Sequence, residues 1–435
     1  MINAYDIAYG LGVGIASPYW LLRPSARRKV LRAFRERMGV VKTRDVSRPG
    51  VMIHAVSLGE MNATRSLVEI LRAERSDLDF VIATTTTSGF DRGQQLYGQS
   101  PSVTLIRYPL DFTRAIDRAL DALRPSVVVL MELELWPNFV RACHRRGIAV
   151  MLANGRLTTA SFRRYRMIKP VMLSMLRRLS LICAQDSTYA QRFIALGARP
   201  DQVDVTGTMK FDTAEIAPSV DGDLEIAAEV GLSPGHEPVW VCGSTGPGEE
   251  EIILRVYRKL LSRFSRLRLG IVPRKPERFD EVARLIESFR FKVVRRSRPA
   301  PSESHPAVPP VVLVDTMGEL RKIYSVADIV FVGRSLVDLG PRQHGSDMIE
   351  PAALAKPVIV GPHTGNFAEA MRHFRAADAM MEVADSDSLA QAVTVLLSTP
   401  AEATAMARRA QQVVRSQQGA TRRHANAILG LLPAE

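Results

Sequence analysis

The sequence predicts an α/β protein built from two Rossmann-like domains. A chain of 435 residues is long for one hydrophobic core and suits two domains of roughly 200 residues each. From Val51 onward, short β-rich apolar runs alternate with amphipathic stretches at helical spacing, which is typical of βαβ units. The same alternation begins again after an irregular acidic stretch at 217–223. Two parallel sheets, each buried on both faces, are therefore expected.

Each predicted domain has its own series of strands. The strands expected in the first half are 51–56, 80–84, 103–108, 127–131, 148–153 and 181–184, and those in the second half are 239–242, 267–272, 311–314, 329–332 and 357–360. The predicted domains are 39–216 and 224–400, with a surface loop at 297–310 in the second. Residues 401–435 are rich in Ala and Arg at helical spacing and predict terminal helices that could pack back on the first domain.

Composition excludes several classes of protein. Hydrophobic residues make up 46% and charged residues 24% of the chain, close to the average for folded soluble proteins, which argues against wholesale disorder and against a polytopic membrane protein. Three cysteines provide neither a disulfide framework nor a metal-ligand cluster, and they fit a reducing cytosol.

The net charge of +13 predicts anionic partners, because a positive field concentrates anionic surfaces and substrates. Aromatic residues are only 6% of the chain, and it carries no zinc-finger, RRM or KH signature, so nucleic acid is not an expected partner. Membrane surfaces and phosphorylated sugars therefore remain as the expected anionic partners.

The beginning of the chain has an order typical of a membrane interface. The apolar stretch 7–22 is followed by seven basic residues, Arg23, Arg27, Arg28, Lys29, Arg32, Arg35 and Arg37. The stretch is shorter than the ~20 residues of a full span and contains three glycines and Pro18, which favours a shallow or re-entrant anchor. Residues 1–38 are therefore predicted to associate with a membrane, and the alternative is a buried N-terminal helix with a solvated basic face.

Two motifs of the first half could carry chemistry, because ligands of an open α/β sheet bind beyond the carboxyl ends of its strands. Glu60 lies in the first turn of the helix after the first strand, where it could act as a general base. On spacing alone a capping box with Ser57 is the favoured explanation. The segment 132–138 brings two carboxylates and a Trp to another strand end, and an acidic helix start explains it equally well.

Four segments of the second half could bind a ligand, and the last three together outline a nucleotide-sugar pocket. The loop 243–250 would let backbone N–H groups approach an anion, although a simple tight turn is a real alternative. Arginine and carboxylate residues follow the next strands at 273–278, 315–320 and 345–351. Arginine can bind phosphate through two parallel hydrogen bonds. Salt bridges and helix caps are, however, the ordinary explanation for such residues.

Eight segments in order resemble one family, the Kdo (3-deoxy-manno-octulosonic acid) transferases of lipopolysaccharide synthesis. The resemblance spans nearly the whole chain and rests on His54–Asn62 (HAVSLGEMN), Glu132–Asn138 (ELELWPN), Asn154–Leu157 (NGRL), Thr206–Asp212 (TGTMKFD), Gly243–Glu250 (GSTGPGEE), Val272–Phe279 (VPRKPERF), Val314–Leu320 (VDTMGEL) and Gly361–Phe367 (GPHTGNF).

The resemblance implies a GT-B fold, with two Rossmann-like domains facing a central cleft. It also implies CMP-Kdo as donor, a lipid A precursor as acceptor, inversion at the anomeric carbon, no cofactor or metal, and work at the cytoplasmic face of the inner membrane. Glu60 would be the catalytic base, and Glu134 would help to arrange the reacting groups. The residues implied for the CMP part of the donor are Arg274, Met317, Gly318, Glu319 and Glu350, and the predicted donor site is completed by Ser244, Pro273 and Asp347.

The chain departs from the family pattern in two places. Gly246 stands where many members carry His, and 345–347 reads Gly-Ser-Asp where others have Gly-His-Asn, with 341–344 extra. The runner-up interpretation is another GT-B protein, a glycosyltransferase or epimerase that uses a UDP-sugar. From a different class, a non-catalytic adaptor that binds membranes or nucleic acid would also explain the basic charge.

Overall fold

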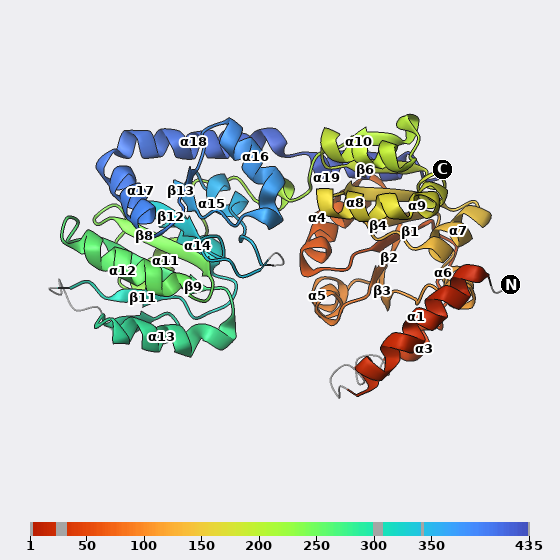
Figure 1. Ribbon diagram of the computed structural model, residues 1–435, viewed down its shortest axis with the longest axis horizontal. Coiled ribbons are helices and arrows are strands. Elements are labelled where there is room, and N and C mark those ends of the chain that lie inside the picture. The colour runs from red at the N-terminus through yellow and green to blue at the C-terminus, as the bar shows by residue number, and fades with distance from the viewer. Residues whose placement is uncertain (1–2, 23–32, 299–307, 341–342, 434–435) are drawn as a thin grey trace. The chain divides into compact units, whose positions relative to one another are not determined.

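The computed structural model describes residues 3–22, 33–298, 308–340 and 343–433, which form two compact units (Figure 1). The first unit runs to Thr213 and takes up the chain again from Gln418, and the second is Ala214–Gln417. The basic residues between 23 and 32 and the middle of the predicted loop 297–310 lie outside the described residues.

The first unit holds a parallel sheet of seven strands in the order β3-β2-β1-β4-β5-β6-β7. Its strands are β1 (Gly50–His54), β2 (Asp79–Thr84), β3 (Val103–Arg107), β4 (Val127–Met131), β5 (Ala149–Gly155), β6 (Leu181–Ala184) and β7 (Val203–Val205). The helices between them are α4 (Leu58–Glu74), α5 (Thr87–Tyr97), α6 (Thr113–Leu123), α7 (Pro137–Arg145), α8 (Thr159–Met167), α9 (Lys169–Leu176) and α10 (Ser187–Leu196). Alternate residues of β1 enter two separate cores, since Met52 packs with α6 and α7 whereas Ile53 packs with α4.

The second unit repeats this architecture with the strand order β10-β11-β9-β8-β12-β13-β14, again all parallel. Its strands are β8 (Val239–Thr245), β9 (Arg268–Pro273), β10 (Val293–Arg295), β11 (Val311–Leu313), β12 (Ile329–Val332), β13 (Val358–Val360) and β14 (Met381–Glu382). Its helices are α11 (Asp223–Glu229), α12 (Glu249–Leu261), α13 (Phe279–Ser288), α14 (Leu320–Ser325), α15 (Ile349–Ala353), α16 (Ala368–Ala376), α17 (Ser386–Ser398) and α18 (Pro400–Gln417).

The predicted α/β fold with two parallel sheets is confirmed, and every strand expected from the sequence overlaps an observed one. The sequence did not indicate β7, β10 and β14, which are two or three residues long and lie at sheet edges. Their side chains are partly exposed, so they lack the continuous apolar character by which buried parallel strands are recognised.

The C-terminal segment is divided between the two units. Helix α18 belongs to the second unit, whereas α19 (Ala420–Leu429) returns to the first and packs against α4 (Figure 1). Ala420, Ala425 and Ile428 of α19 are buried in the core that β1 and α4 share. The last helix of the chain is therefore part of the N-terminal core.

His424 of α19 fixes the end of β5, where one of the family motifs begins. The fully buried ring accepts a hydrogen bond through Nε2 from the backbone N–H of Asn154 at 2.8 Å and donates through Nδ1 to the carbonyl of Ala420 at 2.7 Å. Burial lowers the pKa of His424 to about 4. The neutral imidazole thus serves as an acceptor that an imidazolium could not provide.

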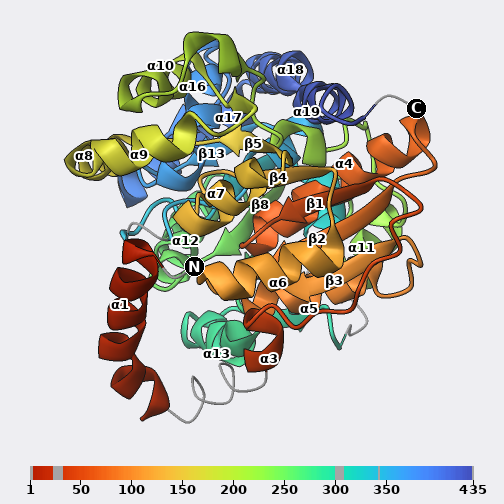
Figure 2. The same cartoon turned by 90° about the vertical axis from the view of Figure 1, so that its right-hand side faces the viewer.

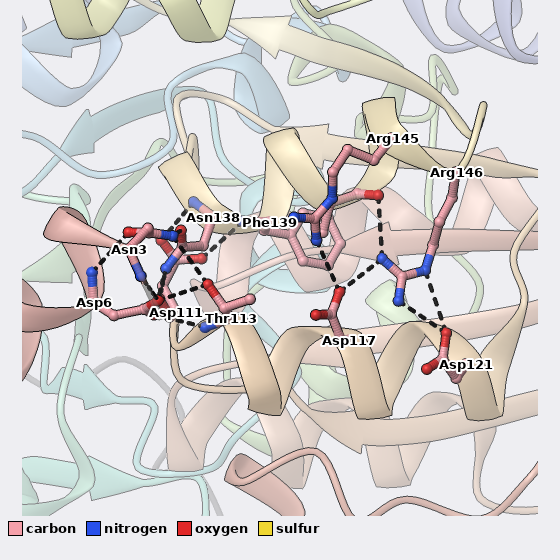
Figure 3. Close-up of polar contacts among 11 residues, drawn as sticks. Asn3, Asp6, Asp111, Thr113, Asp117, Asp121, Asn138, Phe139, Arg145 and Arg146 are labelled. Carbon is pink, nitrogen blue, oxygen red and sulfur yellow. Dashed lines mark hydrogen bonds and ion pairs between the residues drawn. The ribbon is translucent and has the colours of Figure 1, made fainter. Parts of the chain in front are cut away.

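The N-terminal helix α1 (Ala4–Leu21) is joined to the first unit by buried polar contacts (Figure 3). The Asp6 carboxylate accepts hydrogen bonds from the backbone N–H and the hydroxyl of Thr113, both at 2.7 Å, and from the Asn138 side chain at 3.0 Å. Asp111 accepts the N–H groups of Asn138 and Phe139 at 3.0 and 2.9 Å. Asp6 and Asp111 therefore occupy the N-terminal ends of α6 and α7, where a carboxylate is favourable.

Beyond its first turn, α1 exposes apolar side chains. Ile7, Leu11 and Ile15 are 60%, 63% and 82% exposed, and the helix runs away from α6 and α7 (Figure 2). It continues through its three glycines and Pro18 as one α-helix, and the predicted shallow or re-entrant anchor stays a prediction. Within the described parts of the chain, no helix combines the length and the apolar character needed to cross a membrane. The short helix α3 (Phe34–Arg37) follows, and Arg37 bonds to the carbonyl of Thr85 at 2.5 Å.

We expect His424 to make stability depend on pH. Between its ordinary pKa of 6.5 and the folded value of about 4, the unfolded chain binds a proton that the folded chain does not. The contribution of neutral His424 to the free energy of unfolding is fully present above pH 6.5. It is lost as the pH falls below this value, by about 1.4 kcal/mol per pH unit. Urea unfolding at pH 7 and at pH 5 gives the free energy of unfolding at each pH. Between these two values, this free energy should fall more in the parent than in His424→Gln, whose side chain stays neutral. The exposed His144→Gln variant is the control, and equal slopes in parent and His424→Gln would contradict the assignment.

Candidate functional site

The candidate site of the first unit lies where the strand order of its sheet reverses, between β1 and β4. In doubly wound sheets, ligands bind beyond the carboxyl ends of the strands at this point. The residues that follow β1 and β4 include Glu60, Glu132 and Glu134. The topology therefore brings the carboxylates of two sequence motifs to one edge of the sheet.

Glu60 forms the capping box that the sequence suggested. The Ser57 hydroxyl accepts the Glu60 N–H at 3.1 Å, and the Glu60 carboxylate accepts the N–H groups of Val56 and Ser57 at 2.9 and 3.2 Å. The Glu60 side chain remains partly exposed at the beginning of α4. Capping and catalysis do not exclude each other here, because the two N–H groups fix the carboxylate in one orientation and leave it open to a ligand.

Glu134 is held by aromatic neighbours. Its carboxylate accepts the indole N–H of Trp136 at 3.2 Å and lies 3.7 Å from Nε2 of His54. His54 is fully buried, stacks on Tyr108 with ring centroids 3.8 Å apart, and bonds through Nδ1 to the carbonyl of Ala83. The ring nitrogen that faces Glu134 is buried and has no hydrogen-bond partner. This arrangement orients Glu134 rather than exposing it freely to solvent.

Glu132 shows that the charges of this site are crowded. Its backbone is left-handed, with φ of 54°, a conformation that costs energy in a non-glycine residue and is frequent at functional sites. Burial and the nearby Glu60 carboxylate raise its pKa, whereas Lys210 and Arg156 act to lower it. The cations come from the two motifs 154–157 and 206–212, so four separated segments of sequence meet in one cluster.

The candidate site of the second unit also lies at a reversal of strand order, between β8 and β12. Glu249, the first residue of α12, is buried there, and its carboxylate accepts four backbone N–H groups at 2.6–2.9 Å, those of Gly246, Arg334, Ser335 and Leu336. The sequence predicted that the loop 243–250 offers its N–H groups to an anion. For the Gly246 N–H this is wrong, because the protein's own carboxylate occupies it.

Two arginines meet at this reversal. Arg274 follows β9, is exposed, and donates its backbone N–H to the carbonyl of Thr245 at 3.0 Å. Arg334 follows β12 with a left-handed backbone, φ of 58°, and its buried Nε has no hydrogen-bond partner. Burial and the positive charge of Arg274 lower the pKa of Arg334. An anion between the two guanidinium groups would remove this repulsion and supply an acceptor.

Two of the predicted acidic residues, Asp347 and Glu350, lie near Tyr324. Burial and the neighbouring Asp347 raise the pKa of Glu350 to about 7. The charges of Arg274, Asp347 and Glu350 all act on Tyr324. Burial and the negative charges of Glu350 and Asp347 raise the pKa of Tyr324, whereas the positive charge of Arg274 acts to lower it. The buried Tyr324 hydroxyl has no hydrogen-bond partner. Arg274, Asp347 and Glu350 therefore all lie near Tyr324.

The remaining predicted residues lie at the ends of β8, β9 and β11. Ser244 and Pro273 are buried strand-end residues, and the carbonyl of Ser244 accepts the Ser346 hydroxyl at 3.3 Å. Met317 is 64% exposed, and Gly318 has the positive φ of 88° that suits glycine. Glu319 accepts hydrogen bonds from Thr316 and from Arg296, so part of its bonding capacity serves the protein itself.

Sequence reasoning did not single out Arg334, Arg156, Lys210 or His54. The last three lie inside motifs that were recognised as segments, and this was the available signal. No sequence motif pointed to Arg334, because it lies outside every recognised segment. It is positioned next to Arg274 only by the order of the strands in the sheet.

The chain is similar in sequence to proteins of one known family. A family described as 3-deoxy-D-manno-octulosonic-acid transferase (kdotransferase) matches residues 32–213. The 3-deoxy-D-manno-octulosonic acid transferase of Haemophilus influenzae is 35% identical over 379 residues, 86% of this chain and 85% of that protein. The corresponding transferase of Bordetella pertussis is 32% identical and covers 87% of this chain and 86% of its own length.

Solved structures share the architecture at low sequence identity. The UDP-GlcNAc 2-epimerase of Neisseria meningitidis matches with a TM-score of 0.58 at 15% identity, covering 88% of this chain and 100% of that one. A glycosyltransferase of Rickettsia africae matches with a TM-score of 0.58 at 13% identity, covering 89% and 100%. These likenesses show the fold alone, which is the predicted GT-B fold.

Proposed function

Because this chain belongs to the family of 3-deoxy-D-manno-octulosonic acid transferases, we propose that it moves Kdo from CMP-Kdo to a lipid A precursor, with Glu60 as general base. The observation that carries this proposal is the fixed Glu60 carboxylate at the β1–β4 reversal. Its neighbour Glu132 lies near Lys210 and Arg156, whose positive charges act to lower the Glu132 pKa. The proposed base therefore lies among groups of both charges.

The proposed reaction is a single displacement. An acceptor hydroxyl attacks the anomeric carbon of Kdo, and Glu60 takes the hydroxyl proton as the new C–O bond forms. The bond to the CMP phosphate breaks, and CMP leaves with its electron pair. Attack from the side opposite to the leaving group inverts the anomeric carbon. Glu134, oriented by Trp136 and His54, would arrange the reacting groups, and no step is assigned to a metal or other cofactor.

The donor is proposed to bind at the β8–β12 reversal. The Arg274–Arg334 pair is suited to the CMP phosphate, because fixed guanidinium groups stabilise the charge that develops as CMP leaves. Glu319 and Glu350, with Met317 and Gly318, are proposed to contact the rest of the nucleotide. Ser244, Pro273 and Asp347 complete the proposed pocket.

The acceptor is a lipid, so we also propose that the protein works at the cytoplasmic face of the inner membrane. Two exposed features of the first unit support this location. Helix α1 presents Ile7, Leu11 and Ile15. At the α8–α9 junction, Met167 is 84% exposed, and exposed basic residues surround it at Arg163, Arg164, Arg166 and Lys169. Apolar and basic groups together are the combination that anionic membrane surfaces bind.

The role of Glu60 can be separated from its capping role. We expect Glu60→Gln to lower kcat by about 10²–10⁴-fold, the usual cost of losing a general base. CMP affinity should be unchanged. Ser57→Ala is the matched control, because it removes the same cap at a cost of about 1 kcal/mol and keeps the carboxylate. If Glu60→Gln and Ser57→Ala both retain near-parental turnover, Glu60 is a helix cap only.

The arginine pair should decide nucleotide affinity. We expect Arg274→Ala and Arg334→Ala each to weaken CMP binding by roughly 10- to 100-fold, because a hydrogen bond to a charged group contributes about 1.5–3 kcal/mol. Calorimetry measures this, with the exposed Arg284→Ala of α13 as control. Competition by UDP as strong as that by CMP would favour the UDP-sugar alternative, and unchanged CMP affinity in both variants would place the phosphate elsewhere.

The membrane proposal is tested on the exposed face of α1. Deleting residues 1–22 would also remove Asp6 from α6, so substitution is the cleaner change. We expect the triple variant Ile7→Glu, Leu11→Glu, Ile15→Glu to keep its unfolding transition but to co-float poorly with vesicles containing anionic lipid. A double control, Val205→Glu and Leu224→Glu, alters exposed apolar residues elsewhere and should float like the parent. Equal flotation of the triple variant and the parent would refute an anchoring role for α1.

A further inference from the structure

Among the residues that the structure describes, one group of three metal-ligating side chains lies close together outside the proposed reaction. It consists of Asp338, His344 and His363, whose ligand atoms all lie within 4.8 Å of one another. Asp338 and His344 belong to the loop after β12, and His363 belongs to the loop after β13. The group therefore joins two segments that neighbouring parallel strands bring side by side.

The backbone of this group is fixed by hydrogen bonds. The N–H of His363 donates to the carbonyl of Ser335 at 2.8 Å, and the carbonyl of His344 accepts from Asn366 at 3.1 Å. Asp338 accepts the N–H of Gly340 at 2.8 Å through Oδ1, which also lies 2.8 Å from Nε2 of His344. The rings of His344 and His363 are 5.0 Å apart at their centroids. Both loops are thus held together before any ligand binds.

The chemistry of the three side chains selects one class of ligand. Two imidazoles and one carboxylate suit zinc and related transition metals, whereas Mg²⁺ and Ca²⁺ prefer oxygen ligands alone. Metal–ligand distances of about 2.0–2.2 Å place tetrahedral ligand atoms about 3.4 Å apart. Rotation about side-chain torsions would close the present separations, since Asp338 is exposed and the two histidines are partly exposed.

We propose that Asp338, His344 and His363 bind one transition-metal ion, zinc in the first instance, with water in the fourth position. The ion links the loop after β12 to the loop after β13 and takes no part in the transfer reaction. A plain ion pair between His344 and Asp338 accounts for two of the three residues. It does not account for His363, which comes from another strand end.

The test uses the full chain after dialysis against EDTA. Zn²⁺ is titrated against a chromophoric chelator, and one equivalent is expected to bind to the parent. Outer-sphere partners of metal ligands typically contribute about 10–100-fold in affinity, so loss of a direct ligand in His344→Ala, His363→Ala or Asp338→Asn should cost at least about 100-fold. The exposed His236→Ala in the same domain is the control and should bind like the parent.

Two further measurements keep the result interpretable. In EDTA, each variant should unfold at the same temperature as the parent, whereas added Zn²⁺ should raise the Tm of the parent and the control only. Co²⁺ bound to the parent should show the visible absorption of a tetrahedral site. This absorption should be absent when Co²⁺ is added to His363→Ala. Absence of one-equivalent binding, or full retention of affinity in His363→Ala, would overturn the proposal. Neither outcome bears on Glu60 or on CMP binding, so the two proposals fail separately.

Discussion

The reversal of strand order in each parallel sheet is the constraint on which the rest of the molecule depends. Strands on either side of the reversal send their helices to opposite faces, and the loops at their carboxyl ends part around a space where a ligand can bind. In the first unit this occurs between β1 and β4, and in the second between β8 and β12. Glu60 and Arg334 owe their positions to this one feature of topology, although their loops have unrelated sequences.

Carboxylates hold these loops in place. Glu249 accepts four backbone N–H groups and joins the ends of β8 and β12, while Glu250 pairs with Arg278 through both carboxylate oxygens at 2.6 and 3.0 Å. Glu60 accepts two N–H groups but keeps part of its surface open. The proposed base Glu60 therefore differs from these two structural carboxylates in how much of its bonding capacity the protein itself uses.

Segments from both ends of the chain complete the first unit. Asp6 reaches the beginning of α6, and His424 supports the backbone at Asn154. Each replaces water at a buried backbone group that would otherwise lack a partner. The ring of Tyr9 on α1 lies 6.5 Å from that of Trp136, which in turn holds Glu134. The exposed helix and the candidate site are thus connected through a short series of side-chain contacts.

The sequence by itself determined the α/β class, the two sheets and most of their strands, because buried parallel strands are continuous apolar runs whose signal is local. It also singled out Glu60, Glu134 and Arg274 as candidate site residues through short motifs at strand ends, and their roles stay predictions. The tertiary structure alone decided that Gly246 donates to Glu249, that Arg334 joins Arg274, that α19 belongs to the first core, and that His363 meets His344. These are contacts between segments far apart in sequence, and they depend on strand order and on buried hydrogen bonds that no local pattern records.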